Sequence, residues 1–165
     1  FLTKIVGNST LMVMKLTTRG RYAVTAMLDL AINGGSRPVA LADISSRQEI
    51  SLSYLEQLFA KLRRGKLVIS ARGPGGGYRL ARSRTDIFVA QIIDAVDESV
   101  DVTSCQGKGN CHHGETCLTH HLWEDLSGQI HEFLSRISLG DLMDKRDPRH
   151  RRMSADGMLQ TLSVR

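Results

Sequence analysis

The sequence is poor in the residues that stabilise small secreted proteins and membrane proteins. Its 165 residues include three cysteines, three prolines and one tryptophan, and aromatic residues make up only 5% of the chain. An odd number of cysteines argues against a disulfide framework, and no uninterrupted apolar run reaches the roughly 18 residues of a membrane span. The first residues also lack the basic, then apolar, then small-residue pattern of a signal peptide. We therefore expect a soluble, cytoplasmic protein with reduced cysteines and no membrane contact.

The charged residues that are present are unevenly distributed along the chain. Residues 14–84 contain 13 Lys and Arg against 4 Asp and Glu, whereas residues 85–144 contain 2 against 11. The formal net charge of +5 therefore hides a basic first half and an acidic second half. A solvated surface does not by itself predict so clear a division, and a basic segment of this kind is typical of nucleic-acid binding.

Three helices are predicted in the basic half. Apolar residues three and four apart indicate a core helix that ends at Asn33-Gly34-Gly35 and a short second helix within residues 39–51. A third helix is capped by Ser51 or Ser53 and ends at Gly65. This order of elements is that of a helix-turn-helix.

A β-hairpin is predicted directly after the third helix. Residues 67–71 and 78–80 read as short strands joined by a Gly-Pro-Gly-Gly-Gly turn. The sequence therefore indicates a mainly α-helical protein with a small β-hairpin wing, in which residues 14–84 form a winged helix-turn-helix domain. The wing and the charge pattern are independent arguments for binding to double-stranded DNA.

The third helix and the wing supply the candidate DNA contacts. In a winged helix-turn-helix the third helix enters the major groove, and the hairpin lies along the backbone or probes the minor groove. Arg72, at the hairpin tip, is a candidate for a minor-groove or phosphate contact, and Lys61 and Arg64 are phosphate candidates. Glu56 is repelled by phosphates, so it either pairs with Lys61 or Arg64 or accepts a hydrogen bond from cytosine N4. We favour the base-reading role.

The acidic half predicts a partner-binding helix. Its longest amphipathic segment, about residues 118–137, carries an apolar stripe that needs a covering surface, and a homodimer is the expected solution, with packing on the same domain as the alternative. Residues 85–144 are expected to form a cluster-binding loop and dimerisation helices, ending in a short helix over SLGDLMDK. Residues 1–13 are interpreted as a non-native or disordered extension before a start at Met14, and residues 145–165 as a disordered basic tail.

A compact group of potential metal ligands precedes the long helix. All three cysteines and four of the six histidines lie in CQGKGNCHHGETCLTHH. Three evenly spaced cysteines on a glycine-rich loop fit a nucleophilic-cysteine enzyme poorly, so we expect no enzymatic activity. Structural zinc sites usually pair ligands two residues apart, whereas iron-sulfur clusters require thiolates and accept imidazole in place of some. The candidate ligands are Cys105, Cys111, Cys117 and His120, with His112, His113 and His121 as alternatives to His120.

These motifs make the sequence similar to a known family. From Met14 to about Asp144 it resembles the IscR transcription regulators, which are small dimeric winged-helix repressors with a C-terminal sensory loop. The resemblance rests on LTTRGRYAVTAMLDLA, ISLSYLEQLFAKLRRGKLV, RGPGGGYRLAR, AVDESVD, CQGKGNC, TCLTH and LW. It implies a 2Fe-2S cluster, a wing position for Arg72, and positions on the recognition helix for Ser53, Tyr54, Glu56 and Gln57. The implied cluster ligands are Cys105, Cys111, Cys117 and His120.

The resemblance also implies a function. Such a regulator senses the supply of iron-sulfur clusters, represses the genes for cluster assembly when its own cluster is bound, and binds a second class of promoter without it. The implied partners are operator DNA, a second copy of the chain, and the cluster assembly machinery as cluster donor. Two alternatives stay open, a nitric-oxide-sensing iron-sulfur repressor of the same family and a zinc-stabilised winged-helix repressor.

Overall fold

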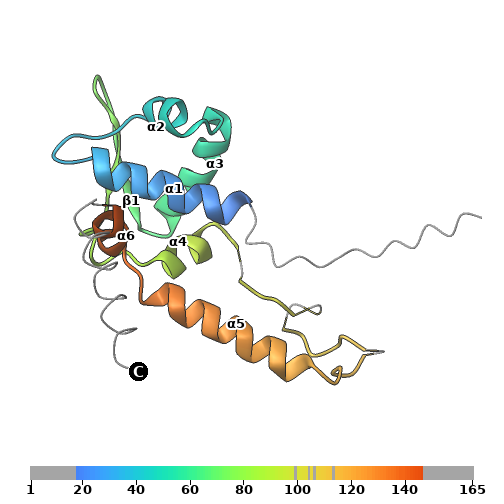
Figure 1. The fold of residues 1–165 in the computed structure, drawn as a ribbon. Helices are drawn as coiled ribbons and strands as arrows, with labels where there is room; N and C mark the ends of the chain where they lie inside the picture. Colours follow the sequence, from blue (N-terminus) through green and yellow to red (C-terminus); the bar gives the residue numbers. More distant parts are fainter. Residues whose placement is uncertain (1–17, 99, 104, 106, 113, 147–165) are drawn as a thin grey trace, which may run out of the picture.

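The computed structural model describes residues 18–146 except 99, 104, 106 and 113. Within them it confirms the predicted architecture, which is mainly α-helical with one two-stranded antiparallel sheet (Figure 1). The elements in chain order are α1 (Thr18–Asn33), α2 (Leu41–Gln48), α3 (Leu52–Arg64), β1 (Val68–Ala71), β2 (Gly77–Leu80), α4 (Val89–Ala95), α5 (His120–Ser135) and α6 (Leu139–Arg146).

One hydrophobic core joins α1, α2, α3 and the wing. The apolar stripes of α1 and α3 face each other because their buried residues recur three and four positions apart. The core also includes Ile44 of α2, Ile92 of α4 and Leu139 of α6, all fully buried. The buried core residues of these two stripes are Ala23, Ala26, Met27, Leu30, Leu55, Leu58, Phe59 and Leu62.

The start and end of α3 follow the local sequence. Ser51 is the N-cap, and its hydroxyl accepts a hydrogen bond from the backbone N–H of Tyr54 at 3.4 Å, so the alternative cap at Ser53 is wrong. Gly65 ends the helix as predicted. A Cβ atom at this glycine would lie 2.9 Å from Cβ of Ala95, so the absence of a side chain lets α3 end directly against α4.

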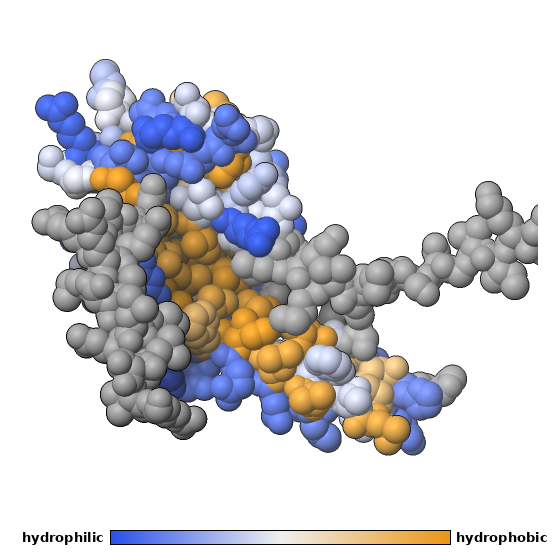
Figure 2. Space-filling view, in the orientation of Figure 1, coloured by the Kyte–Doolittle hydropathy of each residue, from blue (hydrophilic) through white to orange (hydrophobic). Residues whose placement is uncertain are grey.

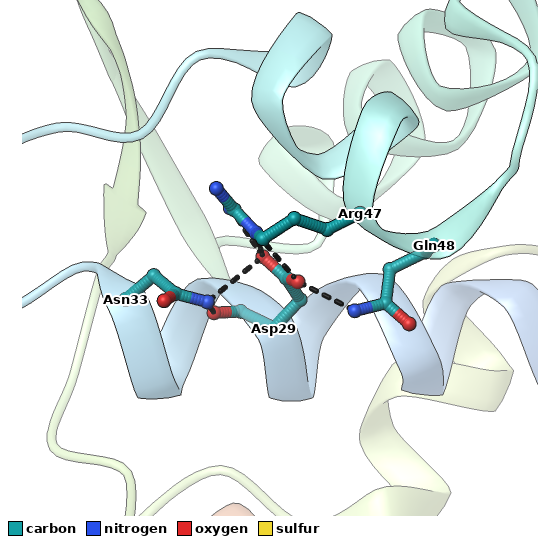
Figure 3. Close-up of polar contacts among 4 residues, drawn as sticks. All are labelled: Asp29, Asn33, Arg47 and Gln48. Atoms are coloured by element: carbon teal, nitrogen blue, oxygen red, sulfur yellow. Dashed lines mark hydrogen bonds and ion pairs between the residues drawn. The ribbon is translucent and has the colours of Figure 1, made fainter.

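A buried carboxylate connects α1 to α2 (Figure 3). Asp29 is 4% exposed, although it lies on the apolar face of α1. Its two oxygens accept hydrogen bonds from Arg47 Nη2 at 2.6 Å, Arg47 Nε at 3.0 Å, Gln48 Nε2 at 2.6 Å and Asn33 Nδ2 at 3.3 Å. Burial raises the pKa of Asp29, but the hydrogen bonds from Arg47 and Gln48 outweigh burial and hold the pKa below its usual 3.8. The second helix is thereby fixed on the first.

The wing packs on α3 through one face of its hairpin. The strand register pairs Val68 with Leu80 and Ile69 with Arg79, so alternate pairs face opposite sides of the sheet. Tyr78 stacks edge-on against Phe59 of α3, with ring centroids 4.9 Å apart. The neighbouring position requires glycine, because Gly77 has φ of +153° and a Cβ there would lie 2.2 Å from the carbonyl oxygen of Val39.

The long helix α5 leaves much of its apolar surface uncovered. In Figure 1 it extends along one side of the molecule, away from α1, α2 and α3. Leu122 is 59% exposed and Phe133 is 63% exposed, and apolar side chains gather along this helix in Figure 2. The alternative that the stripe packs on its own domain therefore accounts for only part of it. The helix begins at His120, two residues after the predicted start near residue 118, so Cys117 precedes it.

The predicted terminal segments lie largely outside the described residues. This holds for residues 1–13, for Met14 and for residues 147–165, so the disorder expected there stays a prediction. Helix α6 continues to Arg146, so its last two residues belong to the predicted tail. Among the described residues, none of the helices combines the length and apolar character that a membrane span needs.

Candidate metal centre and nucleic-acid interface

The predicted ligand loop is attached to α5 by hydrogen bonds. The hydroxyl of Ser127, on α5, accepts from the backbone N–H of Val102 at 3.0 Å, donates to the carbonyl oxygen of Trp123 at 2.7 Å and lies 3.4 Å from Asp101 Oδ1. Asp101 also accepts from the backbone N–H of Thr103 at 2.7 Å. The hydroxyl of Thr103 in turn accepts from the backbone N–H of Gly107 at 2.7 Å. These bonds hold the approach to the first cysteine in one conformation.

Three of the four predicted ligands converge on one point. The Sγ atom of Cys105 lies 3.5 Å from Nδ1 of His120, and Sγ of Cys111 lies 3.7 Å from the same nitrogen. The three ligand atoms all lie within 4.8 Å of one another. His120 is 4% exposed, so its imidazole is shielded from solvent beside the two thiols. Cys117 lies beside this group, and its backbone N–H donates to Sγ of Cys111 at 3.0 Å.

The three thiols have different acidities. Burial acts to raise the pKa of Cys105, but hydrogen bonds from the Gly109 backbone and the Thr103 hydroxyl outweigh it and lower the pKa from 9.0 to about 7. For Cys111 the backbone N–H of Cys117 lowers the pKa, but the adjacent thiols of Cys117 and Cys105 prevail and raise it. The pKa of Cys117 is lowered by hydrogen bonds from Cys111 and Thr119. At least one thiolate is therefore accessible near neutral pH, and a thiolate is the form that binds metals.

The alternative histidines do not join this group where the structure describes them. His121 is on the outer side of α5, with its side chain 81% exposed, and its Nδ1 lies 3.4 Å from Glu124 Oε2. His112 is exposed and forms an isolated β-bridge with Glu115. His113 lies outside the described residues. The positions therefore favour His120 as the imidazole ligand.

The predicted base-reading residues lie on the exposed side of α3. Ser53, Glu56 and Gln57 are exposed, whereas Tyr54 is partly buried and stacks edge-on against Tyr22 of α1. Glu56 is in no ion pair among the described residues. The alternative that it pairs with Lys61 or Arg64 therefore finds no support.

The predicted phosphate contacts differ in their surroundings. Arg72 is exposed at the turn of the wing, and Arg64 is exposed at the end of α3. Lys61 instead faces α4, where its ammonium group lies 2.8 Å from Asp97 Oδ2 and 3.4 Å from the carbonyl oxygen of Val96. This hydrogen bond lowers the pKa of Asp97. Lys61 thus connects the recognition helix to the segment that leads into the ligand loop.

Two polar contacts, those of Asp29 and the pair of Lys61 with Asp97, were not predicted from the sequence. Asp29 had a detectable signal, because an acidic residue on an otherwise apolar helix face requires a buried partner. The pairing of Lys61 with Asp97 had none, since the two residues are 36 positions apart and both belong to segments rich in charge. Only the packing of α3 on α4 brings them together.

Several known proteins share most of this sequence. Residues 16–145 match the Rrf2 family of iron-dependent transcriptional regulators. The chain belongs to the Rrf2 family. It is 70% identical over 134 residues to the putative HTH-type transcriptional regulator ORF2 of Azotobacter vinelandii, a match that covers 81% of this chain and 82% of that protein. It is 64% identical to the HTH-type transcriptional regulator IscR of Vibrio campbellii, covering 79% and 77% of the two chains.

A solved structure supports the same assignment. The structure of T. potens IscR is 39% identical to this Rrf2 protein, with a TM-score of 0.67, and the match covers 82% of this chain and 90% of that one. The comparisons confirm the winged-helix fold, the similarity to IscR regulators and the prediction of a DNA-binding transcriptional regulator. Because the relatives are regulators, the prediction that the chain is not an enzyme is also confirmed.

Proposed function

We propose that this Rrf2 protein senses iron-sulfur cluster supply and represses the genes for cluster assembly. In this proposal a 2Fe-2S cluster is held by Cys105, Cys111, Cys117 and His120. The convergence of two thiols on the buried imidazole of His120 is the observation that carries it. The bound cluster supplies a signal, because its presence or loss reports the cell's capacity to make such clusters.

The residues present fit an iron site. Tetrahedral coordination with metal–ligand bonds near 2.1–2.3 Å places neighbouring ligand atoms about 3.6 Å apart. The distances of 3.5 Å and 3.7 Å from His120 Nδ1 to the two sulfur atoms match this value. Cys117, whose backbone N–H donates to Sγ of Cys111, would complete the ligand set. The same compactness fits a single zinc ion, so a zinc-stabilised repressor is the second candidate function.

The ligand loop is positioned to link cofactor binding to the dimerisation helix. His120 is the first residue of α5, and Ser127, two turns further along, holds the loop through Val102 and Asp101. We propose residues 14–84 as the DNA-binding half and residues 85–144 as the sensory and dimerisation half. In this arrangement a second copy covers the exposed apolar side chains of α5, which include Leu122 and Phe133.

DNA recognition is assigned to the exposed side of α3 and to the wing. Ser53, Tyr54, Glu56 and Gln57 face or border the major groove, and Arg72 contacts the minor groove or a phosphate. Arg64 and Lys61 remain proposed phosphate contacts, although the contact of Lys61 with Asp97 competes with that role. The remaining proposed partners are the cluster assembly machinery as donor and double-stranded operator DNA, in the cytoplasm.

The cofactor is tested by anaerobic purification followed by a visible spectrum and by iron, acid-labile sulfide and zinc analysis. The parent protein is compared with His120→Ala, and His121→Ala serves as the matched control on the adjacent, exposed position. We expect equal amounts of iron and sulfide in the parent and in His121→Ala, with an altered or lost spectrum in His120→Ala. Zinc without sulfide in the parent would replace the cluster sensor by the zinc-stabilised repressor.

The base-reading role of Glu56 needs a separate experiment. Operator variants compete for the parent, for Glu56→Ala and for Glu56→Gln at one salt concentration. If Glu56 accepts a hydrogen bond from a base, both substitutions change the rank order of operators. The binding free energy of operators that differ at the contacted base should then shift by about 1–3 kcal/mol. A uniform gain in affinity for all operators would show that Glu56 only repels phosphates, and the base-reading role would be wrong.

A further inference from the structure

A cavity lies at the base of the wing, away from the ligand loop. Its volume is about 480 Å³, and it is lined by the C-terminal end of α1, both wing strands and the segment that follows β2. This volume is within the range of about 300–1,000 Å³ that is typical of small-molecule sites. The floor is apolar, and its exposed apolar surface comes mainly from Ile69 and Leu80, because Leu30 beside them is fully buried. Ile69 is 48% exposed, so a large apolar side chain faces solvent here.

Three arginines surround this apolar floor. Arg79, Arg82 and Arg84 all line the cavity, and no acidic residue does so among the residues that the structure describes. None of the three forms an ion pair within that part of the chain. The polar contacts of Arg82 and Arg84 are with neutral groups, namely Gln91 Oε1 at 3.3 Å and Met143 Sδ at 3.8 Å. Like charges gathered without a counter-charge create a local field that attracts an anion.

The arginines are attached to ordered backbone. Arg79 is in β2, directly opposite Ile69 in the strand register. The carbonyl oxygen of Arg84 accepts a hydrogen bond from the backbone N–H of Gly140 in α6 at 3.0 Å. Because the backbone is fixed before any ligand binds, less conformational entropy is lost on binding than from a mobile loop.

The cavity takes side chains from both faces of the wing, since Leu80 is on the face of Tyr78 and only Arg79 and Ile69 are turned away from α3. Side chains alternate between the two faces of a strand, so Arg79 and Tyr78 point to opposite sides of the hairpin. Tyr78 packs on Phe59 of α3, which places Arg79 and Ile69 on the other face. The DNA contacts proposed above are on α3 and at the tip of the wing. The position of the cavity thus favours a small ligand over the DNA backbone.

We propose that this cavity binds a small organic anion, in which a carboxylate or phosphate group contacts the arginines and a short apolar body covers Ile69 and Leu80. Guanidinium groups form charge-assisted, often bidentate, hydrogen bonds with both kinds of anion. The apolar floor selects against fully hydrated inorganic ions, which gain nothing from contact with Ile69 or Leu80. This proposal does not depend on the cofactor or on the operator.

The site is tested with sodium octanoate as the probe. The full-length protein is titrated by calorimetry at constant ionic strength, with sodium acetate and inorganic phosphate as comparison anions. We expect saturable binding of octanoate that is at least about tenfold tighter than that of acetate, because four to six additional buried methylene groups each contribute to affinity. Tighter binding of octyl phosphate than of octanoate would identify a phosphate headgroup, and the reverse order a carboxylate.

Three variants assign the binding to this cavity. Arg79→Gln combined with Arg82→Gln is expected to weaken octanoate binding by about tenfold or more. Ile69→Ser is expected to weaken octanoate but leave the weak phosphate binding unchanged, and its exposed position avoids damage to the core. Arg21→Gln, which removes an exposed arginine near the other end of α1, is the control and retains binding.

Three results would overturn the proposal. The first is the absence of saturable octanoate and octyl phosphate binding at millimolar concentrations. The second is an equal loss in Arg21→Gln, which would mean that general positive charge is responsible. The third is that the double variant binds octanoate like the parent but loses affinity for all DNA sequences with a shallower salt dependence, which would make Arg79 and Arg82 phosphate contacts.

Discussion

Replacing Arg47 with methionine tests whether the buried carboxylate of Asp29 fixes α2 on α1. Methionine keeps much of the aliphatic bulk of arginine. It removes the three hydrogen bonds that the guanidinium group donates to the carboxylate. Gln48 and Asn33 still donate to Asp29, so the carboxylate keeps two partners. Its negative charge, however, loses its only ion-pair partner within the described residues.

The magnitude follows from the exposure of the two side chains. Breaking a fully buried ion pair costs about 3–5 kcal/mol, because the remaining charge is left uncompensated. The Asp29 side chain is 2% exposed, but that of Arg47 is 38% exposed, so solvent screens part of the interaction. We therefore expect a loss of about 2–3 kcal/mol in the free energy of unfolding. For a protein of this size the loss corresponds to a decrease in Tm of about 6–12 °C.

The assay is thermal and urea unfolding followed by circular dichroism at pH 7. Arg37→Met is the control, since Arg37 is exposed and in no ion pair within the described part of the chain. A double-mutant cycle with Asp29→Asn isolates the pairwise coupling, and the double variant should lose less than the sum of the single variants. A Tm for Arg47→Met within about 2 °C of that of Arg37→Met would refute the reasoning.

The same contact predicts a pH dependence. The pKa of Asp29 is held below its usual value in the folded protein, so the unfolded chain binds more protons as the pH falls. The stability from this carboxylate is therefore complete above about pH 5 and lost as the pH falls below about 4, through the folded-state pKa. The difference between the parent and Arg47→Met should stay constant from pH 8 to pH 5 and decrease below pH 4. A difference that increased on acidification would contradict the sign.

Three further predictions concern the wing and the ligand loop. Gly77→Ala forces a Cβ within 2.2 Å of the Val39 carbonyl oxygen, and we expect a loss of about 2 kcal/mol or more in urea unfolding, with weaker DNA binding. Arg72→Ala should weaken binding to all operators and reduce the slope of log K against log salt by about 1, whereas an unchanged slope would exclude a phosphate contact. Ser127→Ala removes the hydrogen bond from the Val102 N–H but leaves all the proposed ligands in place, so it should speed metal loss in a chelator challenge. Equal rates of metal loss in the parent and the variant would contradict this prediction.

The elements that could be predicted from sequence are those with local signals. The periodicity of α1, the glycine at the end of α3 and the glycine-rich turn of the wing each depend on a few neighbouring residues. The predicted start of α5 near residue 118 is two residues too early, because the apolar periodicity includes Leu118 although the helix begins at His120. That Cys105, Cys111 and His120 belong to one ligand group could be expected from their spacing and from the resemblance to the IscR regulators, but their distances depend on how the loop folds back on α5.

Contacts between distant segments connect the two halves of the molecule, and sequence carries no local signal for them. The C-terminal end of α3 approaches α4 so closely that Gly65 leaves no room for a side chain beside Ala95. One helical turn before Gly65, the ammonium group of Lys61 binds Asp97 and the carbonyl oxygen of Val96, which follow Ala95 in the chain. The chain then runs only a few residues to Asp101, which is tied to α5 and to the loop of the proposed ligands. A change in the loop that moved this segment would therefore reach α3 through Lys61, which would give the proposed ligand binding a short route to the proposed DNA-binding helix.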